Sequence, residues 1–243
     1  MCELFLLIQY STNIYSPLKY FYDIYIILIH IGNVKNIVKN ILFRRNIILK
    51  SLSQTKTAEN LAKAFAGESQ ARNRYSFYSQ KAKQDGHEQI AAVFLETADN
   101  ERAHAKVFFD LLVNGLGKSD IKVDADYPVG FGTTEDNLLY AAEGEKAEWG
   151  TLYPSFAEIA KTEGFPEVEL AFKNIMKIEE GHEKRYLDLM NSLKSGNLYK
   201  KASEQNWKCI NCGFIYTGLE APKICPACKY PQGYFEIMYD TKG

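Results

Sequence analysis

Apolar residues recur every three or four positions in four long segments between residues 53 and 194, which is the period of an amphipathic α-helix. Turns containing Gly86 and Gly164 separate two pairs of these segments, and a longer connection, residues 116–132, joins the pairs. Ser and Thr at 53–57 are expected to cap the first helix, and Gly115 is expected to end the second. The pattern predicts a mainly α-helical four-helix bundle whose long connection crosses one end.

Ionisable residues stand on the apolar stripe of each predicted helix. The stripes are Leu61, Phe65, Glu68 and Tyr75; Phe94, Glu101, His104, Phe108 and Leu111; Leu138, Ala141, Glu145, Glu148 and Leu152; and Val168, Phe172, Ile175, Glu179, His182, Tyr186 and Leu189. A carboxylate and an imidazole three residues apart share one side of a helix. Burying an unpaired carboxylate is costly, so a bound cation is the expected compensating charge.

The ionisable residues on the four stripes are a Glu from the first helix, Glu-x-x-Glu from the third, and Glu-x-x-His from the second and fourth. Ferritin-like di-iron carboxylate bundles use one Glu from each of two helices and Glu-x-x-His from the other two. Oxygen and imidazole ligands without thiolate suit iron or manganese, and bridging carboxylates let two metals share a redox reaction. His30 and His87 lack such surroundings and are interpreted as ordinary residues.

Four of the five cysteines form two Cys-x-x-Cys pairs near the C-terminus, Cys209 with Cys212 and Cys225 with Cys228. In a chain without a convincing secretory signal, this pattern indicates a metal site in a reducing compartment before a disulfide framework. Four thiolates suit tetrahedral zinc or iron, and their spacing does not separate a zinc ribbon from an iron site. The aromatic residues around the pairs resemble the packing of rubredoxin, which favours iron: they are Trp207, Phe214, Tyr216, Tyr234 and Phe235.

Residues 1–49 differ from the rest, since Ile, Asn, Tyr and Lys supply 24 of the first 48 residues. Codons made only of A and T encode these amino acids, so one interpretation is upstream DNA translated by an over-extended gene model. The alternatives are a disordered extension, a targeting peptide in residues 24–50, or a membrane anchor in residues 20–31. The apolar run of the anchor contains Asp23 and is shorter than the roughly 20 residues that a span needs. Cys2 is interpreted as a bystander.

Composition limits the classes of partner. The 243 residues are 46% hydrophobic and 24% charged, which suits one sizeable core and a small module. The net charge is −1, and without the first 48 residues 24 basic and 28 acidic residues leave −4. We therefore expect no nucleic-acid partner, and we expect no membrane association and a cytoplasmic location.

Four runs of sequence carry a resemblance to a known family. They are residues 66–75 (AGESQARNRY), 96–106 (ETADNERAHAK), 153–157 (YPSFA) and 182–186 (HEKRY). Residues 50–240 resemble rubrerythrins, which have a ferritin-like bundle followed by a small rubredoxin-like Fe(Cys)4 β domain. The resemblance implies an atypical extension (1–49), a bundle (50–195), a linker (196–206) and a rubredoxin-like domain (207–241). It also aligns Leu49 with the family's starting Met, which supports the over-extended gene model.

The resemblance implies roles for individual residues. The di-iron ligands would be Glu68, Glu101, His104, Glu145, Glu148, Glu179 and His182, and the single iron would be bound by Cys209, Cys212, Cys225 and Cys228. Glu101 and Glu179 would bridge the irons, and one iron would shift between Glu148 and His104 with redox state. Tyr75 and Tyr153 would hydrogen-bond ligating carboxylates. Lys229 departs from the Gly that free-standing rubredoxins have after the last Cys, so it is expected to disturb amide bonds to sulfur.

The implied activity is reduction of hydrogen peroxide to water by a non-haem di-iron peroxidase that protects against oxidative stress. Electrons would arrive through the Fe(Cys)4 centre from rubredoxin or an NAD(P)H-dependent reductase, because nothing in the chain resembles a dinucleotide-binding Gly-rich loop. A homodimer or larger homo-oligomer would bring that centre close to the di-iron site of another subunit. The alternatives are a ferroxidase that handles iron like a ferritin, and a zinc-ribbon adaptor.

Overall fold

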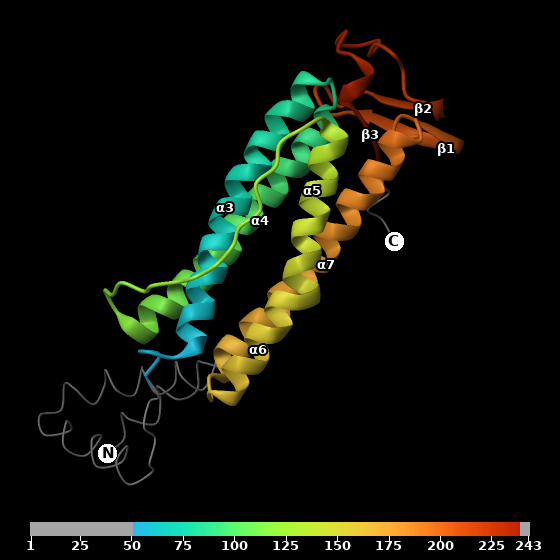
Figure 1. Cartoon of the computed structure of the whole chain (residues 1–243). Helices are drawn as coiled ribbons and strands as arrows, with labels where there is room; N and C mark the ends of the chain where they lie inside the picture. The colour runs from blue at the N-terminus through green and yellow to red at the C-terminus, as the bar shows by residue number, and fades with distance from the viewer. Residues whose placement is uncertain (1–50, 239–243) are drawn as a thin grey trace, which may run out of the picture. The chain divides into compact units, whose positions relative to one another are not determined.

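Six helical segments form the larger part of the computed structural model, which describes residues 51–238. They are α3 (Lys56–Gln84), α4 (Glu88–Leu116), α5 (Thr134–Ala147), the π-helical turn η1 (Glu148–Leu152), α6 (Tyr153–Thr162) and α7 (Pro166–Lys194). The antiparallel pair α3 and α4 packs beside a second pair, in which α5 and α6 run against α7 (Figure 1). The predicted four-helix bundle is confirmed. Residues 1–49, with their proposed artefact, targeting or anchor roles, lie outside the described residues.

The long connection, residues 117–133, runs lengthwise along the bundle, so the expectation that it crosses one end is wrong (Figure 1). Because α4 and α5 point in the same direction, the chain must travel a bundle length between them. The connection is fastened to α3 along the way. Tyr127 donates its hydroxyl to the carbonyl of Lys63 (3.1 Å), and the hydroxyl of Tyr78 on α3 donates to the carbonyl of Gly130 (2.8 Å).

Helix ends largely follow their cap residues. The side chain of Thr55 accepts a hydrogen bond from the amide of Ala58, and Thr133 forms a capping box with Asp136. However, α4 ends at Leu116 and its C-cap is Gly117 (φ 65°), two residues beyond the expected Gly115. A Cβ at Gly115 would lie 2.2 Å from Cδ1 of Leu52, so this glycine permits close packing and does not end the helix.

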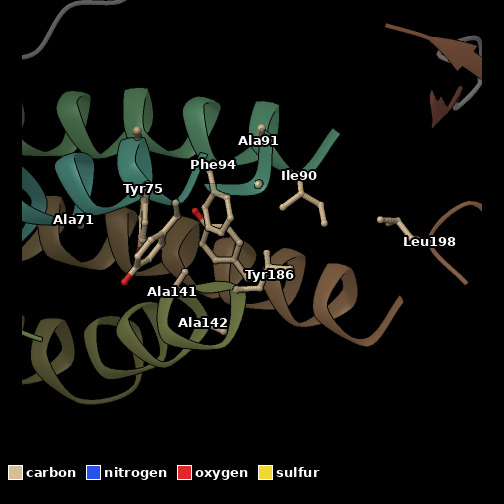
Figure 2. Packing of buried hydrophobic residues seen from close by; sticks show 13 residues of the cluster. Ala71, Tyr75, Ile90, Ala91, Phe94, Ala141, Ala142, Tyr186 and Leu198 are labelled. Atoms are coloured by element: carbon tan, nitrogen blue, oxygen red, sulfur yellow. The ribbon is translucent and has the colours of Figure 1, made fainter. Parts of the chain in front are cut away.

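Two apolar clusters fill the bundle on either side of its ionisable residues. Figure 2 shows Tyr75, Phe94 and Tyr186 converging from three helices with Ala141 of a fourth. The second cluster includes Leu61, Phe108, Tyr153 and Phe172. On α3, α4 and α7 the ionisable stripe residues fall between members of the two clusters in sequence, so they form a polar layer in the core. Phe65, Leu111 and Leu189, expected on the stripes, pack at the edges of these clusters.

A small three-stranded antiparallel sheet follows the bundle, in the order β2-β1-β3. It consists of β1 (Lys200–Cys209), β2 (Ile215–Glu220) and β3 (Phe235–Ile237), with a 3-10 turn, η2 (Gln232–Tyr234), before β3. The sheet begins inside the segment 196–206 that we expected to be linker, because Lys200 already pairs with Glu220. Leu198 just before β1 is buried against the bundle core, which leaves little free chain between the two parts.

Candidate metal centres

Six of the seven predicted bundle ligands come together in the polar layer. They form two overlapping groups, Glu68, Glu101, His104 and Glu179, and Glu101, Glu145, Glu179 and His182. Within each group, one oxygen or nitrogen per residue lies within 4.8 Å of all the others. Glu101 and Glu179 belong to both groups, and they are the two residues expected to bridge.

Both imidazoles direct Nδ1 at the shared carboxylates. Nδ1 of His104 lies 2.9 Å from Oε2 of Glu101 and 2.8 Å from Oε1 of Glu179. Nδ1 of His182 lies 2.8 Å from Oε2 of Glu179 and 3.3 Å from Oε1 of Glu101. Helical spacing explains this convergence, because Glu-x-x-His on α4 and on α7 presents both groups to the same interior space.

The layer contains several buried ionisable side chains. The carboxylates of Glu68, Glu101, Glu145 and Glu179 are at most 1% exposed. Burial and then repulsion from neighbouring carboxylates raise the pKa of Glu68 and of Glu145 well above the ordinary value. Burial would also raise the pKa of Glu101, but its interactions with the two imidazoles outweigh burial and lower it to about 2.

The pKa values of the two imidazoles are raised in turn by the carboxylates around them. Burial disfavours their charged form, yet contacts with Glu101 and Glu179 raise the pKa of His104 to about 12 and that of His182 to about 9. The carboxylates thus favour positive charge in the centre of the layer. Several oxygens there accept no hydrogen bond of suitable geometry, although some lie close to an imidazole nitrogen: they are Oε2 of Glu68, Oε1 of Glu101, Oε2 of Glu145 and both oxygens of Glu179. A pair of cations bound by these atoms would satisfy both the charge and the unpaired oxygens, so the residues fit a di-metal site.

Two tyrosine hydroxyls form hydrogen bonds with carboxylates of the predicted ligands. Tyr75 donates to Oε1 of Glu145 and Tyr153 donates to Oε1 of Glu68, each at 2.5 Å. The sequence interpretation missed Asn100, whose Nδ2 lies 3.3 Å from Nε2 of His182. Asn100 directly precedes Glu101, and only its position on the flank of that motif could have suggested the contact.

Glu148 is the one predicted ligand that belongs to neither group of four. It begins the π-helical turn, is half-buried, and lines a cavity with Tyr153. Burial, followed by the charges of Glu179 and Glu101, raises its pKa well above the ordinary value. The expectation that Leu152 continues the inner stripe is wrong, since its side chain is 43% exposed. A π-helical turn has i→i+5 hydrogen bonds in place of i→i+4, which shifts the faces on which residues after Glu145 lie.

The π-helical turn is fastened to α7 by a contact that the sequence did not reveal. Nε1 of Trp149 donates to Oε2 of Glu183 at 2.6 Å, and Nζ of Lys146 lies 3.8 Å from the centre of the indole ring. Neither Trp149 nor Glu183 lies on an apolar stripe, so periodicity carried no signal for this pair.

The four cysteines converge as predicted, with their sulfur atoms within 4.8 Å of one another. The pairs Cys209–Cys228 and Cys212–Cys225 have Sγ–Sγ distances of 3.7 Å. A tetrahedron with metal–sulfur bonds of about 2.3 Å has edges of about 3.8 Å, so the arrangement fits a single tetrahedral ion.

Two similar turns present these sulfur atoms. The amide of Gly213 donates to the carbonyl of Cys209, and the amide of Lys229 donates to the carbonyl of Cys225. Gly213 has φ 78° and Lys229 has φ 65°, so the lysine adopts the left-handed conformation and keeps the turn.

Aromatic packing around the cysteines is mostly as expected. Trp207 and Phe235 are buried in the cluster with Cys209 and Cys225, and Phe214 and Tyr234 pack against it. Tyr216 is 41% exposed, so the expectation that it joins this packing is wrong. It lies next to Ile215 and Thr217, also exposed, on β2 at the edge of the sheet.

Comparison with known proteins decides the family. Residues 59–190 match the family model described as Rubrerythrin, and residues 207–236 match the one described as Rubrerythrin, rubredoxin-like domain. The chain belongs to the rubrerythrin family. It is 54% identical to Rubrerythrin-1 of Clostridium acetobutylicum over 194 residues, which cover 79% of this chain and 100% of that protein. Rubrerythrin of Clostridium perfringens is 50% identical over 194 residues, with coverage of 79% and 100%.

A solved structure of nigerythrin in a mixed-valence state supports the same assignment. It superposes with a TM-score of 0.52 at 27% identity and covers 78% of this chain and 92% of that one. The chain therefore carries the residues of a di-iron carboxylate site and of a four-cysteine rubredoxin-like site, which favours iron over a zinc ribbon. Among residues 51–238, no helix is long and apolar enough to span a bilayer.

Proposed function

We propose that this rubrerythrin-family oxidoreductase is a peroxidase that reduces hydrogen peroxide to two waters, with two protons and two electrons. The observation that carries the proposal is the pair of overlapping ligand groups sharing Glu101 and Glu179, in a chain that also presents four convergent thiolates. A di-iron site supplies two electrons at one place, whereas an Fe(Cys)4 site passes electrons singly. Storage of iron needs no such electron donor, which disfavours the ferroxidase alternative.

We assign the ligand roles as follows. The di-iron ligands are Glu68, Glu101, His104, Glu145, Glu148, Glu179 and His182, and the single iron is bound by Cys209, Cys212, Cys225 and Cys228. Glu101 and Glu179, which belong to both groups, would serve both metals, and the hydroxyls of Tyr75 and Tyr153 orient two of the other carboxylates. The apolar clusters on both sides of the layer exclude bulk water from it.

We further propose that His104 and Glu148 alternate as ligands when the redox state changes. In support, His104 lies inside one ligand group, whereas Glu148 lies outside both and lines a cavity beside the site. A carboxylate stabilises the more highly charged oxidised metals and an imidazole suits the reduced ones. The π-helical turn places Glu148 at the edge of the site, and none of the five residues of this turn is fully buried.

Electrons are proposed to enter through the Fe(Cys)4 centre from rubredoxin or an NAD(P)H-dependent reductase. The rubredoxin-like part contacts its own bundle where the hydroxyl of Tyr234 donates to Glu88 at 3.1 Å. Glu88 precedes Glu101 by 13 residues, about 20 Å along α4. This distance supports a homodimer in which the centre serves the bundle of the other subunit. A cytoplasmic location remains our expectation.

Stopped-flow mixing of the anaerobically reduced protein with hydrogen peroxide tests the proposal through the visible absorption of the Fe(Cys)4 centre. We expect much faster reoxidation by peroxide than by air. Glu179→Ala should abolish peroxide turnover and keep the visible spectrum, whereas Glu180→Ala, which changes an exposed neighbour, should keep both. Cys212→Ser should stop electron flow to the bundle. A coloured protein that reacts quickly with oxygen and not with peroxide would establish the iron-oxidase alternative, and a colourless one the zinc-ribbon adaptor.

A further inference from the structure

A cavity of about 350 Å³ lies beside the di-iron ligands, between α3, the long connection and the helical run from α5 to α6. A water molecule takes up about 30 Å³ of liquid, so the cavity is several times larger than hydrogen peroxide requires. Its volume falls in the range of sites that bind small organic molecules, roughly 300–1,000 Å³. The cavity is therefore larger than the substrate of the proposed function explains.

The inner end of the cavity reaches the site. Its wall includes the Glu148 side chain and Tyr153, whose hydroxyl donates to Glu68. Gly67 leaves room at this point, because a Cβ there would lie 3.8 Å from Oε1 of Glu148 and 3.7 Å from Cε1 of Tyr127. A molecule in the cavity would thus have one end beside ligand carboxylates.

The rest of the cavity has mainly apolar and aromatic walls. Ala64, Ala147, Leu152 and Phe156 line it from three helical elements and η1. The long connection closes another side, and Arg74 of α3 holds it through a 3.4 Å hydrogen bond to the carbonyl of Pro128. Apolar walls offer little to hydrogen peroxide, but they favour an alkyl or aryl group that leaves water.

We propose that the protein also reduces organic hydroperoxides, with the organic group held in this cavity and the peroxide group at the metals. This inference rests on the proposed peroxidase function and extends its substrate class. The O–O bond breaks, one oxygen leaves as the alcohol ROH and the other as water. The reaction consumes two protons and two electrons, and the proposed electron donor, rubredoxin or an NAD(P)H-dependent reductase, restores the electrons through the Fe(Cys)4 centre.

The test compares cumene hydroperoxide with hydrogen peroxide in stopped-flow reoxidation of the reduced holoprotein. We expect both to reoxidise it, and we expect Leu152→Trp, which fills the cavity from an exposed position, to lower the cumene-to-hydrogen peroxide rate ratio by about tenfold or more. Ala147→Leu fills the same cavity from the end of α5 and should act in the same direction. Leu170→Trp changes an exposed leucine of α7 outside the cavity and should leave the ratio unchanged.

Binding is measured separately from turnover. Equilibrium dialysis of the metal-loaded protein against 2-phenyl-2-propanol, the product alcohol, should show binding that Leu152→Trp weakens and Leu170→Trp does not. Reduction of hydrogen peroxide with no reaction of cumene hydroperoxide would overturn this inference and leave the proposed function standing. Failure with both peroxides would overturn both, and an unchanged rate ratio in the two cavity-filling variants would overturn the assigned cavity.

Discussion

Tyr75 and Tyr153 act on the ligand layer from its two sides, one within each apolar cluster. Each hydroxyl is buried and donates to one oxygen of a predicted ligand carboxylate, so the other oxygen would be available to a metal. Burial, together with nearby carboxylates, raises the pKa of both phenols well above 10.0, so they remain donors over the whole working range of pH. Such partners fix the orientation of a ligand before the metal arrives.

Removal of one hydroxyl should therefore weaken metal binding. We expect Tyr153→Phe to lower the affinity for iron by about 10- to 100-fold, measured by competition with a chelator. The matched control is Tyr78→Phe, because Tyr78 is also buried but donates to the backbone carbonyl of Gly130. Equal losses of affinity in the two variants would show that the effect comes from general packing.

The metal-free protein should lose stability as the pH rises from 6.5 to 9. Burial opposes the charge on His182, but the surrounding carboxylates raise its pKa from 6.5 to about 9. A raised pKa contributes stability that is complete below 6.5 and disappears as the pH passes 9. The raised pKa values of Glu68 and Glu145 act in the same direction, and Glu101, lowered to about 2, loses its contribution only below 4.5.

Differential scanning calorimetry checks this expectation. The Tm of the metal-free protein should fall across that interval, and the iron-loaded protein should show a smaller decline because cations replace the protons. Parallel pH dependence in the two forms would contradict the assignment of the layer as a metal site.

At the scale of elements, helical periodicity predicted α3, α4 and α7 and the residues that each directs inward. The same periodicity failed after Glu145, because it assumes a constant turn of 3.6 residues and η1 departs from that turn. A sequence gives no count of hydrogen bonds within one turn, so neither the place of Glu148 outside the two ligand groups nor the exposure of Leu152 could be foreseen. The contact between Trp149 and Glu183 was hidden for a different reason, because neither residue lies on an apolar stripe.

The paired turns of the rubredoxin-like part allow a reciprocal test. Lys229 occupies the left-handed position that Gly213 occupies in the other turn, and a side chain there costs about 1–2 kcal/mol. A glycine at this position would avoid that strain, but it loses more conformational freedom on folding, which costs about 0.5–1 kcal/mol and offsets part of the gain. We therefore expect Lys229→Gly to raise stability by roughly 0.5–1 kcal/mol and Gly213→Lys to lower it by at least as much.

Denaturant titrations followed at the visible absorption of the Fe(Cys)4 centre measure both changes. Shifts of the midpoint in opposite directions would confirm the common geometry of the turns. A loss of stability in Lys229→Gly would instead indicate that the 2.9 Å contact of the lysine Nζ with the carbonyl of Pro226 outweighs the backbone cost.

At the scale of the whole described chain, the sequence predicted the helical bundle, the rubredoxin-like part, and the clustering of six ionisable bundle residues and of four cysteines. It could not predict how the domains dock, because the contact depends on the close approach of two backbones. Gly233 in η2 lies against the turn between α3 and α4, and Nδ1 of His87 in that turn lies 3.1 Å from the hydroxyl of Tyr199. His87, interpreted as ordinary from the sequence, thus belongs to the contact between domains.

Gly233→Ala should separate the domains locally. A Cβ at Gly233 would lie 1.8 Å from the carbonyl oxygen of Gly86, and because the obstacle is backbone, the domain must shift. Overpacking of this kind costs about 1–3 kcal/mol, so hydrogen exchange of amides near His87 should accelerate by about tenfold or more. The visible spectrum should stay unchanged, since the four cysteines lie outside the contact.

The control is Gly181→Ala on α7, where an added Cβ meets open space, and it should leave exchange near His87 as in the unchanged protein. The rate of electron transfer to the bundle in Gly233→Ala then distinguishes between two arrangements of the active assembly. If the Fe(Cys)4 centre serves another subunit from a fixed position on its own bundle, loosening that position in Gly233→Ala slows peroxide-driven reoxidation. If the domain instead swings freely to its target, the variant accelerates exchange near His87 and leaves the reoxidation rate unchanged.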